Sequence, residues 1–146
     1  MTAPHVLVSN IMMLKERDRF DAALREMGYV PVWAPDHVSY GQFMDEAQCL
    51  ALAGQADGWL AGDDRISRAV LQASLPRLKV IAKWGTGLDS IDRAAAADLG
   101  IPVLNSPGAF ADAVAEVALG LLQMLTRHLG VIDRAIRTGG WPKPRG

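Results

Sequence analysis

Cysteine is nearly absent from the sequence, since Cys49 is the single one among 146 residues. A lone cysteine cannot form an internal disulfide, and no cluster of cysteine and histidine has the spacing of a zinc site. We therefore expect no metal. Cys49 lies in an apolar stretch, where a small buried hydrophobic residue is a simpler interpretation than a reactive thiol.

An excess of charge of either sign is also absent. The 15 Lys and Arg residues nearly balance the 16 Asp and Glu residues, and the net charge is -1. Such a chain has no general electrostatic attraction for nucleic acid or acidic membrane surfaces, so we expect no nucleic-acid partner. Half of the residues are hydrophobic and 21% are charged. This balance is typical of a folded globular chain, and the length suits one ordinary domain.

Long hydrophobic runs are missing as well. The longest, from Ala113 to Leu125, contains Glu116 and is shorter than the ~20 residues that span a bilayer. The N-terminus has no basic segment, and the pair Ser9-Asn10 interrupts its apolar run, which argues against a signal peptide. We therefore expect a soluble, cytoplasmic chain that has no membrane partner.

What the sequence does contain is an alternation of short apolar runs with helical stretches, typical of a parallel sheet covered by helices. The predicted strands are 5–8, 29–34, 56–61, 78–82 and 102–104, and the predicted helices between them are 16–27, 43–52, 66–75 and 93–99. Asp92 is the expected N-cap of the last helix, and Gly100 its stop. This order predicts an α/β fold with a flavodoxin-like, doubly wound, parallel five-stranded sheet, which binds ligands at the carboxyl ends of its strands.

The last part of the chain differs from the rest. The spacing over 111–138 is helical almost without a break, and its first half is apolar on nearly every side. A helix that is hydrophobic all round must be covered all round, so one of its faces should meet something outside this domain. We predict a domain over 1–108, a long interdomain and dimerisation helix over 109–140 that forms a homodimer, and a truncated linker over 141–146.

A short glycine-rich segment follows the strand predicted at 78–82. In Gly85-Thr86-Gly87, two glycines let backbone N–H groups approach an anion without interference from Cβ atoms, which suits a small carboxylate. A tight turn between a strand and a helix is an equally good interpretation of the spacing alone. The segment is not a dinucleotide fingerprint, because Ser90 stands where G-x-G-x-x-G needs its third glycine and no long helix opens after it.

Three segments in this order closely resemble the D-isomer-specific 2-hydroxyacid dehydrogenase family, in particular its phosphoglycerate dehydrogenase-like branch. They are LKVIAKWGTGLDSID at 78–92, GIPVLNSPG at 100–108 and AVAE at 113–116. The likeness is sharp from about 56 to 145 and only topological before that. It implies an NAD- or NADP-dependent oxidoreductase that acts on the CH–OH group of a small D-2-hydroxy acid, or reduces the matching 2-keto acid. The chain would be its N-terminal substrate-binding domain.

The resemblance also implies roles for matching positions. Backbone N–H groups around Gly85, Thr86 and Gly87 would hold the substrate carboxylate. Phe110 would face the substrate, at a position where many relatives carry an asparagine. Thr86 and Val114 would face the nicotinamide end of the cofactor.

According to the same resemblance, catalysis lies outside this chain. The family's arginine, glutamate and histidine belong to an NAD-binding Rossmann domain, which would be this chain's missing partner. None of His5, His37 and His128 matches that histidine. We therefore expect a truncated chain that has no catalytic residue, does not bind the cofactor tightly and does not turn over substrate alone.

Two carboxylates stand near the place where the phosphoglycerate enzymes carry an arginine–serine pair for the phosphate. Asp63 and Asp64 would repel a phosphate, which argues against phosphoglycerate as the substrate. As a metal or acid/base pair they are less convincing than as a solvated turn that contains a helix N-cap.

An alternative of another class remains open. The chain would then be a stand-alone small-carboxylate-binding or regulatory module that keeps the fold and has lost the chemistry.

Overall fold

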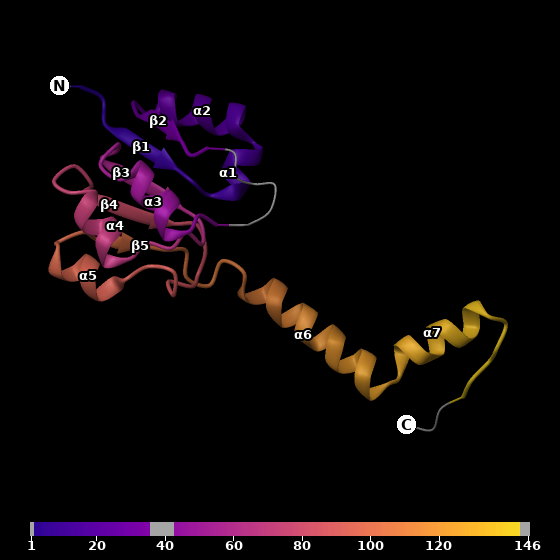
Figure 1. Cartoon of the computed structure of the whole chain (residues 1–146). Helices are drawn as coiled ribbons and strands as arrows, with labels where there is room; N and C mark the ends of the chain where they lie inside the picture. The colour runs from indigo at the N-terminus through magenta and orange to yellow at the C-terminus, as the bar shows by residue number, and fades with distance from the viewer. Residues whose placement is uncertain (1, 36–42, 144–146) are drawn as a thin grey trace. The chain divides into compact units, whose positions relative to one another are not determined.

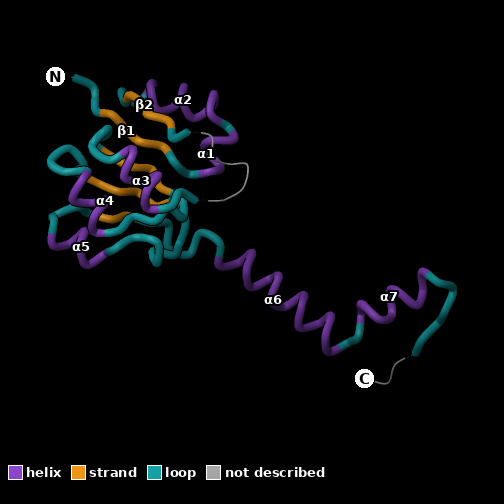
Figure 2. Tube along the Cα trace, in the orientation of Figure 1, coloured by secondary structure: helices purple, strands orange, loops and turns teal. Residues whose placement is uncertain are grey.

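The computed structural model describes residues 2–35 and 43–143. Its first unit contains one sheet of five parallel strands in the order β2-β1-β3-β4-β5 (Figure 2). The strands are β1 (His5–Val8), β2 (Val30–Trp33), β3 (Gly58–Ala61), β4 (Val80–Lys83) and β5 (Val103–Leu104). The predicted flavodoxin-like, doubly wound α/β fold is therefore confirmed.

Five helices of this unit pack on the two faces of the sheet (Figure 1). They are α1 (Ile11–Lys15), α2 (Arg17–Glu26), α3 (Glu46–Leu52), α4 (Arg68–Ala73) and α5 (Arg93–Asp98). Successive side chains of a strand point to opposite faces, so each buried strand contributes to two cores. Leu7, Trp59 and Ile81 belong to the core that includes buried residues of α4 and α5, whereas Val6 and Val8 pack with residues of α1 and α2.

The ends of the helices show which local signals were decisive. The predicted N-cap Asp92 is confirmed, since its side chain accepts a hydrogen bond from the backbone N–H of Ala95 at 2.8 Å. Helix α1 was not expected. It begins after Asn10, whose side-chain oxygen accepts hydrogen bonds from the backbone N–H groups of Met12 and Met13. Asparagine is among the favoured N-cap residues, so this signal was present in the sequence.

The two edges of the sheet are β2 and β5. β5 is only two residues long. β2 contains Pro31 in its interior. On either side of Pro31, the N–H of Val30 donates to the carbonyl of Pro4, just before β1, and the N–H of Ala34 donates to the carbonyl of Val8 in β1.

Residues 108–146 form a second compact unit, separated from the first between Pro107 and Gly108. It contains α6 (Ala111–Thr126) and α7 (Leu129–Arg137). The prediction of one continuous helix over 109–140 is therefore wrong. The helix stops because His128 adopts a left-handed conformation with φ 54°, which histidine tolerates better than most residues. Of the linker predicted at 141–146, residues 144–146 lie outside the described residues, as does His37.

Neither α6 nor α7 buries a side chain within its unit. The most exposed apolar residues of α6 are Val114 (65%), Val117 (63%) and Leu125 (74%). No helix of the described residues is long and apolar enough to cross a bilayer.

Candidate carboxylate-binding site

The carboxyl ends of the parallel strands bring four loops to one edge of the sheet. Backbone hydrogen bonds connect the loops to their neighbours. The N–H of Ser9 donates to Leu60 at 3.0 Å, and the N–H of Trp84 donates to Ala61 at 2.9 Å. This is the edge at which open α/β sheets bind ligands.

The Gly85–Gly87 loop after β4 is held by the segment after β5. Thr86 Oγ1 donates to the carbonyl of Ser106 at 3.1 Å, and Asn105 Nδ2 donates to the carbonyl of Thr86 at 2.8 Å. The N–H of Ser106 donates to the carbonyl of Gly85 at 2.9 Å. These bonds use the carbonyls of Gly85 and Thr86 and the loop's one hydroxyl, whereas the N–H groups of residues 85–87 donate to no other described residue. The loop is thus a fixed turn whose donors are available to an anion.

Gly85 is required by the backbone of this loop. Its φ is 143°, in the region that favours glycine, and a Cβ atom here would lie 3.3 Å from Lys83 Nζ. Gly87 is less restricted, because a Cβ atom at this position would make an ordinary contact of 3.5 Å with Asp89 Oδ2. The first glycine therefore serves the turn and also makes room for an ammonium group beside it.

Lys83 is a residue of this edge that the sequence reasoning missed. It closes β4, and its side chain is only 4% exposed. Its Nζ donates to Asp63 Oδ1 at 2.7 Å, while the Asp63 side chain remains 65% exposed. The available signal was a single cation at the end of an otherwise apolar strand, where a buried charge needs a partner or a function.

Asp64, predicted in a solvated turn, is instead fully buried. Its carboxylate accepts hydrogen bonds from Ser9 Oγ at 2.5 Å, from the Met44 N–H at 2.9 Å and from the Gly62 N–H at 3.0 Å. Ser9 Oγ in turn accepts from Trp59 Nε1 at 2.7 Å. This network joins the ends of β1 and β3 to the segment before α3, and it explains how a carboxylate can be buried here.

The helix N-cap predicted at Asp63-Asp64 is also wrong, because α4 is capped by the side chain of Ser67. Asp64 is enclosed by its donors, and Asp63 is paired with Lys83. Among the described residues, no group of three or more His, Cys, Asp or Glu side chains could hold a metal ion.

The remaining predicted site residues, Phe110 and Val114, lie in the second unit. Phe110 immediately precedes α6 and is 50% exposed, and its carbonyl accepts from the N–H of Val114 at 3.0 Å. The structure therefore places Gly85, Thr86 and Gly87 together in one loop, and Phe110 and Val114 together in one helical turn.

Two strand-to-helix connections of the described residues lack the features of a dinucleotide site. In the part of the chain that the structure describes, β1 leads through Ser9-Asn10 into α1, which is five residues long. The Gly85–Gly87 loop is followed by Ser90 and then by α5, which begins only at Arg93. Neither connection supplies the glycines and the directly following helix that hold a pyrophosphate.

Two cavities open at the carboxyl edge of the sheet. One, of about 190 Å³, is lined by Lys83, Trp84 and Ser106 together with apolar residues. The other, of about 450 Å³, is lined by Asp63 and Arg65 among others. Both have room for a small organic acid.

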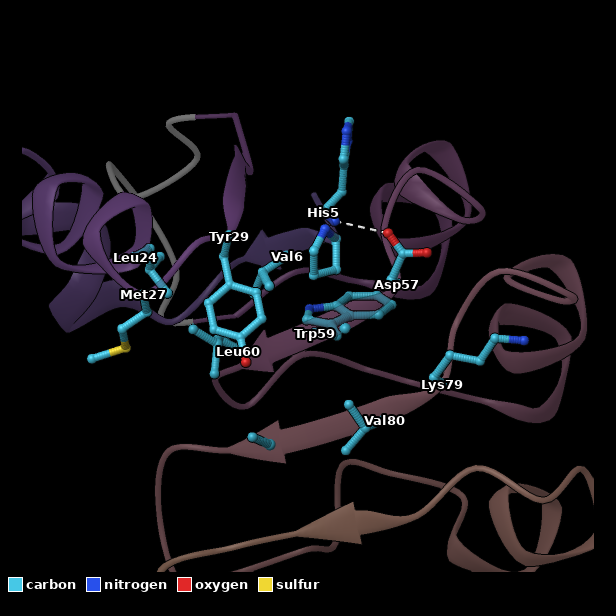
Figure 3. Close-up of a pocket in the computed structure, with 13 residues that line it drawn as sticks. His5, Val6, Leu24, Met27, Tyr29, Asp57, Trp59, Leu60, Lys79 and Val80 are labelled. Atoms are coloured by element: carbon cyan, nitrogen blue, oxygen red, sulfur yellow. Dashed lines mark hydrogen bonds between the residues drawn. The ribbon is translucent and has the colours of Figure 1, made fainter. Parts of the chain in front are cut away.

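A larger cavity of about 520 Å³ lies elsewhere, on the face of the sheet and around the amino ends of β1, β3 and β4 (Figure 3). Its wall is mostly apolar, with Tyr29, Leu60 and Val80 among the lining residues. Asp57 at its rim accepts a hydrogen bond from the His5 N–H at 2.7 Å, which is the main cause that lowers the pKa of this carboxyl.

Cys49 is buried, as expected from its apolar surroundings. Burial raises the pKa of its thiol to about 12, so that the reactive thiolate is not formed near neutral pH.

A family model described as "D-isomer specific 2-hydroxyacid dehydrogenase, catalytic domain" matches residues 7–136. Among curated proteins, glyoxylate reductase from Thermofilum pendens is 44% identical over 81 residues, which is 56% of this chain and 24% of that protein. Chloroplastic D-3-phosphoglycerate dehydrogenase 3 from Arabidopsis thaliana is 37% identical over 79 residues, or 54% of this chain and 13% of that protein.

The fold has counterparts among solved structures. The 2-hydroxyacid dehydrogenase from Ketogulonicigenium vulgare is similar with a TM-score of 0.73 and 22% identity, over 100% of this chain and 45% of that one. At this identity, the likeness concerns the fold alone. The chain spans less than half of the length of each of these three proteins.

Proposed function

We propose, from the premise that this chain belongs to the D-isomer specific 2-hydroxyacid dehydrogenase family, that it is the substrate-binding part of an NAD(P)-dependent oxidoreductase. The reaction would oxidise the CH–OH group of a small D-2-hydroxy acid or reduce the matching 2-keto acid. The observation that carries the proposal is the Gly85–Gly87 loop, which lies at the ligand-binding edge of the sheet with N–H groups that donate to no other described residue.

The chemical role of this loop is to hold and orient. A carboxylate bound by the N–H groups of Thr86 and Gly87 is fixed by charge-assisted hydrogen bonds. Fixing the carboxylate also fixes the adjacent C2 atom, at which a hydride is gained or lost. Because the loop is tied to the segment after β5 by the bonds of Thr86, Asn105 and Ser106, little reorganisation is needed on binding.

A nicotinamide cofactor supplies the hydride chemistry in such a reaction, and an acid/base group moves the hydroxyl proton. From the family resemblance, we assign Thr86 and Val114 to the nicotinamide end of the cofactor, and Phe110 to the substrate. We expect no tight NAD(P) binding by these 146 residues, because the described loops do not form a pyrophosphate cradle. Turnover would depend on a partner NAD-binding domain. The cytoplasmic location stays a prediction.

A small unphosphorylated acid is the favoured substrate class. The Asp63 carboxylate follows β3 at this edge and is 65% exposed, whereas Asp64 is buried. A phosphate placed beside Asp63 would have to compete with this carboxylate for the Lys83 ammonium group.

Calorimetric titration of the 146-residue chain tests the proposal. Glyoxylate and glycolate should bind weakly, the neutral analogue glycolamide should not bind, and NADH should give no heat of binding. Absence of carboxylate binding would contradict the assignment of the loop. Tight binding of either ligand class would favour a stand-alone carboxylate-binding or regulatory module instead.

We also propose that α6 mediates a homodimer, because none of its side chains is buried within its unit. Replacing Leu121 or Leu125 with glutamate should therefore shift the chain to a monomer at tens of micromolar, as measured by light scattering. Gln123→Glu places the same charge on the same helix at a polar position, and it should leave the assembly unchanged. A wild-type chain that is already monomeric under these conditions would contradict the proposal.

A further inference from the structure

We infer that Lys83 is a positioning residue for the substrate carboxylate and that Asp63 is its internal competitor, so that this ion pair sets how strongly the Gly85–Gly87 loop holds an anion. This role rests on the proposed function, since it concerns the same loop.

The first support is the place of the ammonium group. Lys83 ends β4 two residues before Gly85, and its Nζ lies 3.3 Å from the position that a Cβ atom of Gly85 would take. Its side chain is 4% exposed. An anion on the adjacent N–H groups would therefore lie within a few ångströms of a fixed positive charge that is poorly screened by solvent.

The second support is an incomplete set of partners. An ammonium group has three N–H donors. Among the described residues, Lys83 Nζ donates one hydrogen bond, to Asp63 Oδ1 at 2.7 Å. Two donors therefore remain for another acceptor. A buried cation is costly to maintain when only some of its donors have an acceptor. This fits an ammonium group that gains its remaining acceptors when a ligand binds.

The third support is the asymmetry of the ion pair. The Asp63 side chain is 65% exposed, whereas the Lys83 side chain is 4% exposed. Solvent can hydrate Asp63 when it turns away, so an arriving carboxylate can replace it as the partner of the ammonium group. Because the arriving group is itself a carboxylate, the buried ammonium group keeps an anionic partner throughout the exchange.

A purely structural ion pair would behave differently. Replacing either Lys83 or Asp63 would then change the stability of the fold in the same direction and leave the affinity for an anion unchanged. The competitor role instead predicts opposite changes in affinity, because removal of Lys83 deletes the attraction and removal of Asp63 deletes the rival carboxylate.

The experiment is an NMR titration of the ¹⁵N-labelled 146-residue chain with glyoxylate, which follows the amide signals of Thr86 and Gly87. Lys83→Met should weaken binding at least about tenfold, and Lys83→Arg should restore most of it. Asp63→Asn should tighten binding severalfold. The matched control is Lys79→Met, which removes the same net charge at an exposed lysine whose Nζ donates to the Pro76 carbonyl, and it should change affinity less than about twofold.

The outcomes separate the two proposals. If the wild-type Thr86 and Gly87 signals do not respond to glyoxylate, both the proposed function and the role of Lys83 are wrong. If they respond but Lys83→Met binds as Lys79→Met does, only the role of Lys83 is overturned. Should Lys83→Met fail to fold, Asp63→Asn decides, because unchanged or weaker binding by that variant contradicts the competitor role.

Discussion

Replacement of Asp64 with alanine is expected to lower the free energy of unfolding by about 4 kcal/mol, because three donors lose their acceptor in a buried position. These donors are Ser9 Oγ and the N–H groups of Met44 and Gly62. Each unsatisfied buried donor costs about 1–3 kcal/mol. Such a loss is a large part of the roughly 5–15 kcal/mol that stabilises a domain. Urea unfolding followed by tryptophan fluorescence measures it.

The matched control is Asp98→Ala, which removes an aspartate whose ion pair with Arg68 is exposed on both sides. We expect a loss of no more than about 1 kcal/mol from this variant. If Asp64→Ala costs as little as Asp98→Ala, the Asp64 carboxylate is not the fixed centre of a buried network, and its hydrogen bonds do not hold this edge of the sheet together.

Gly85→Ala should weaken glyoxylate binding at least about tenfold while destabilising the fold by only about 1–2 kcal/mol. The new Cβ atom would stand 3.3 Å from Lys83 Nζ, on a residue whose φ is 143°. The Lys83 ammonium group and the loop backbone must then both shift. The N–H groups of Thr86 and Gly87 would consequently no longer have the positions that suit a carboxylate. Titration with glyoxylate and urea unfolding measure the two effects separately.

Gly28→Ala is the control for backbone strain alone. Gly28 has a φ of 85°, and a Cβ atom on it would meet nothing within 4 Å. It follows α2 and lies in no loop of the candidate site. We expect a similar loss of stability and an unchanged affinity, and an equal loss of affinity in the two glycine variants would show that the effect at Gly85 is not local.

The strands and most helices could be predicted because their signals are local. Short buried runs such as His5–Val8 can be recognised without knowledge of distant residues. The same is true of helix N-caps such as Asp92. The break at His128 could not be predicted with the same ease. No proline marks it, and it depends on one residue that tolerates a left-handed backbone.

The candidate site was predictable only in its glycine loop. Gly85 and Gly87 indicate an unusual turn after a strand, and the structure adds that the loop's N–H groups donate to no other described residue. The burial of Asp64 depends on Ser9, 55 residues away in the sequence, and the environment of Lys83 depends on Asp63, 20 residues away. Charged residues at strand ends have no local pattern that tells a solvated side chain from a buried one, because the decisive partners come from other strands.

The proline in β2 has a consequence for how copies of this chain can meet. Since the N–H groups of Val30 and Ala34 donate inward, the amide position of Pro31 faces away from β1, where an ordinary residue would offer a free donor. Proline leaves none, and it costs the sheet no hydrogen bond. At the opposite edge, β5 gives a second chain only two residues to pair with. Both edges of the sheet thus discourage growth by strand addition. We therefore expect copies of this chain to associate through their helices into small assemblies rather than into fibres.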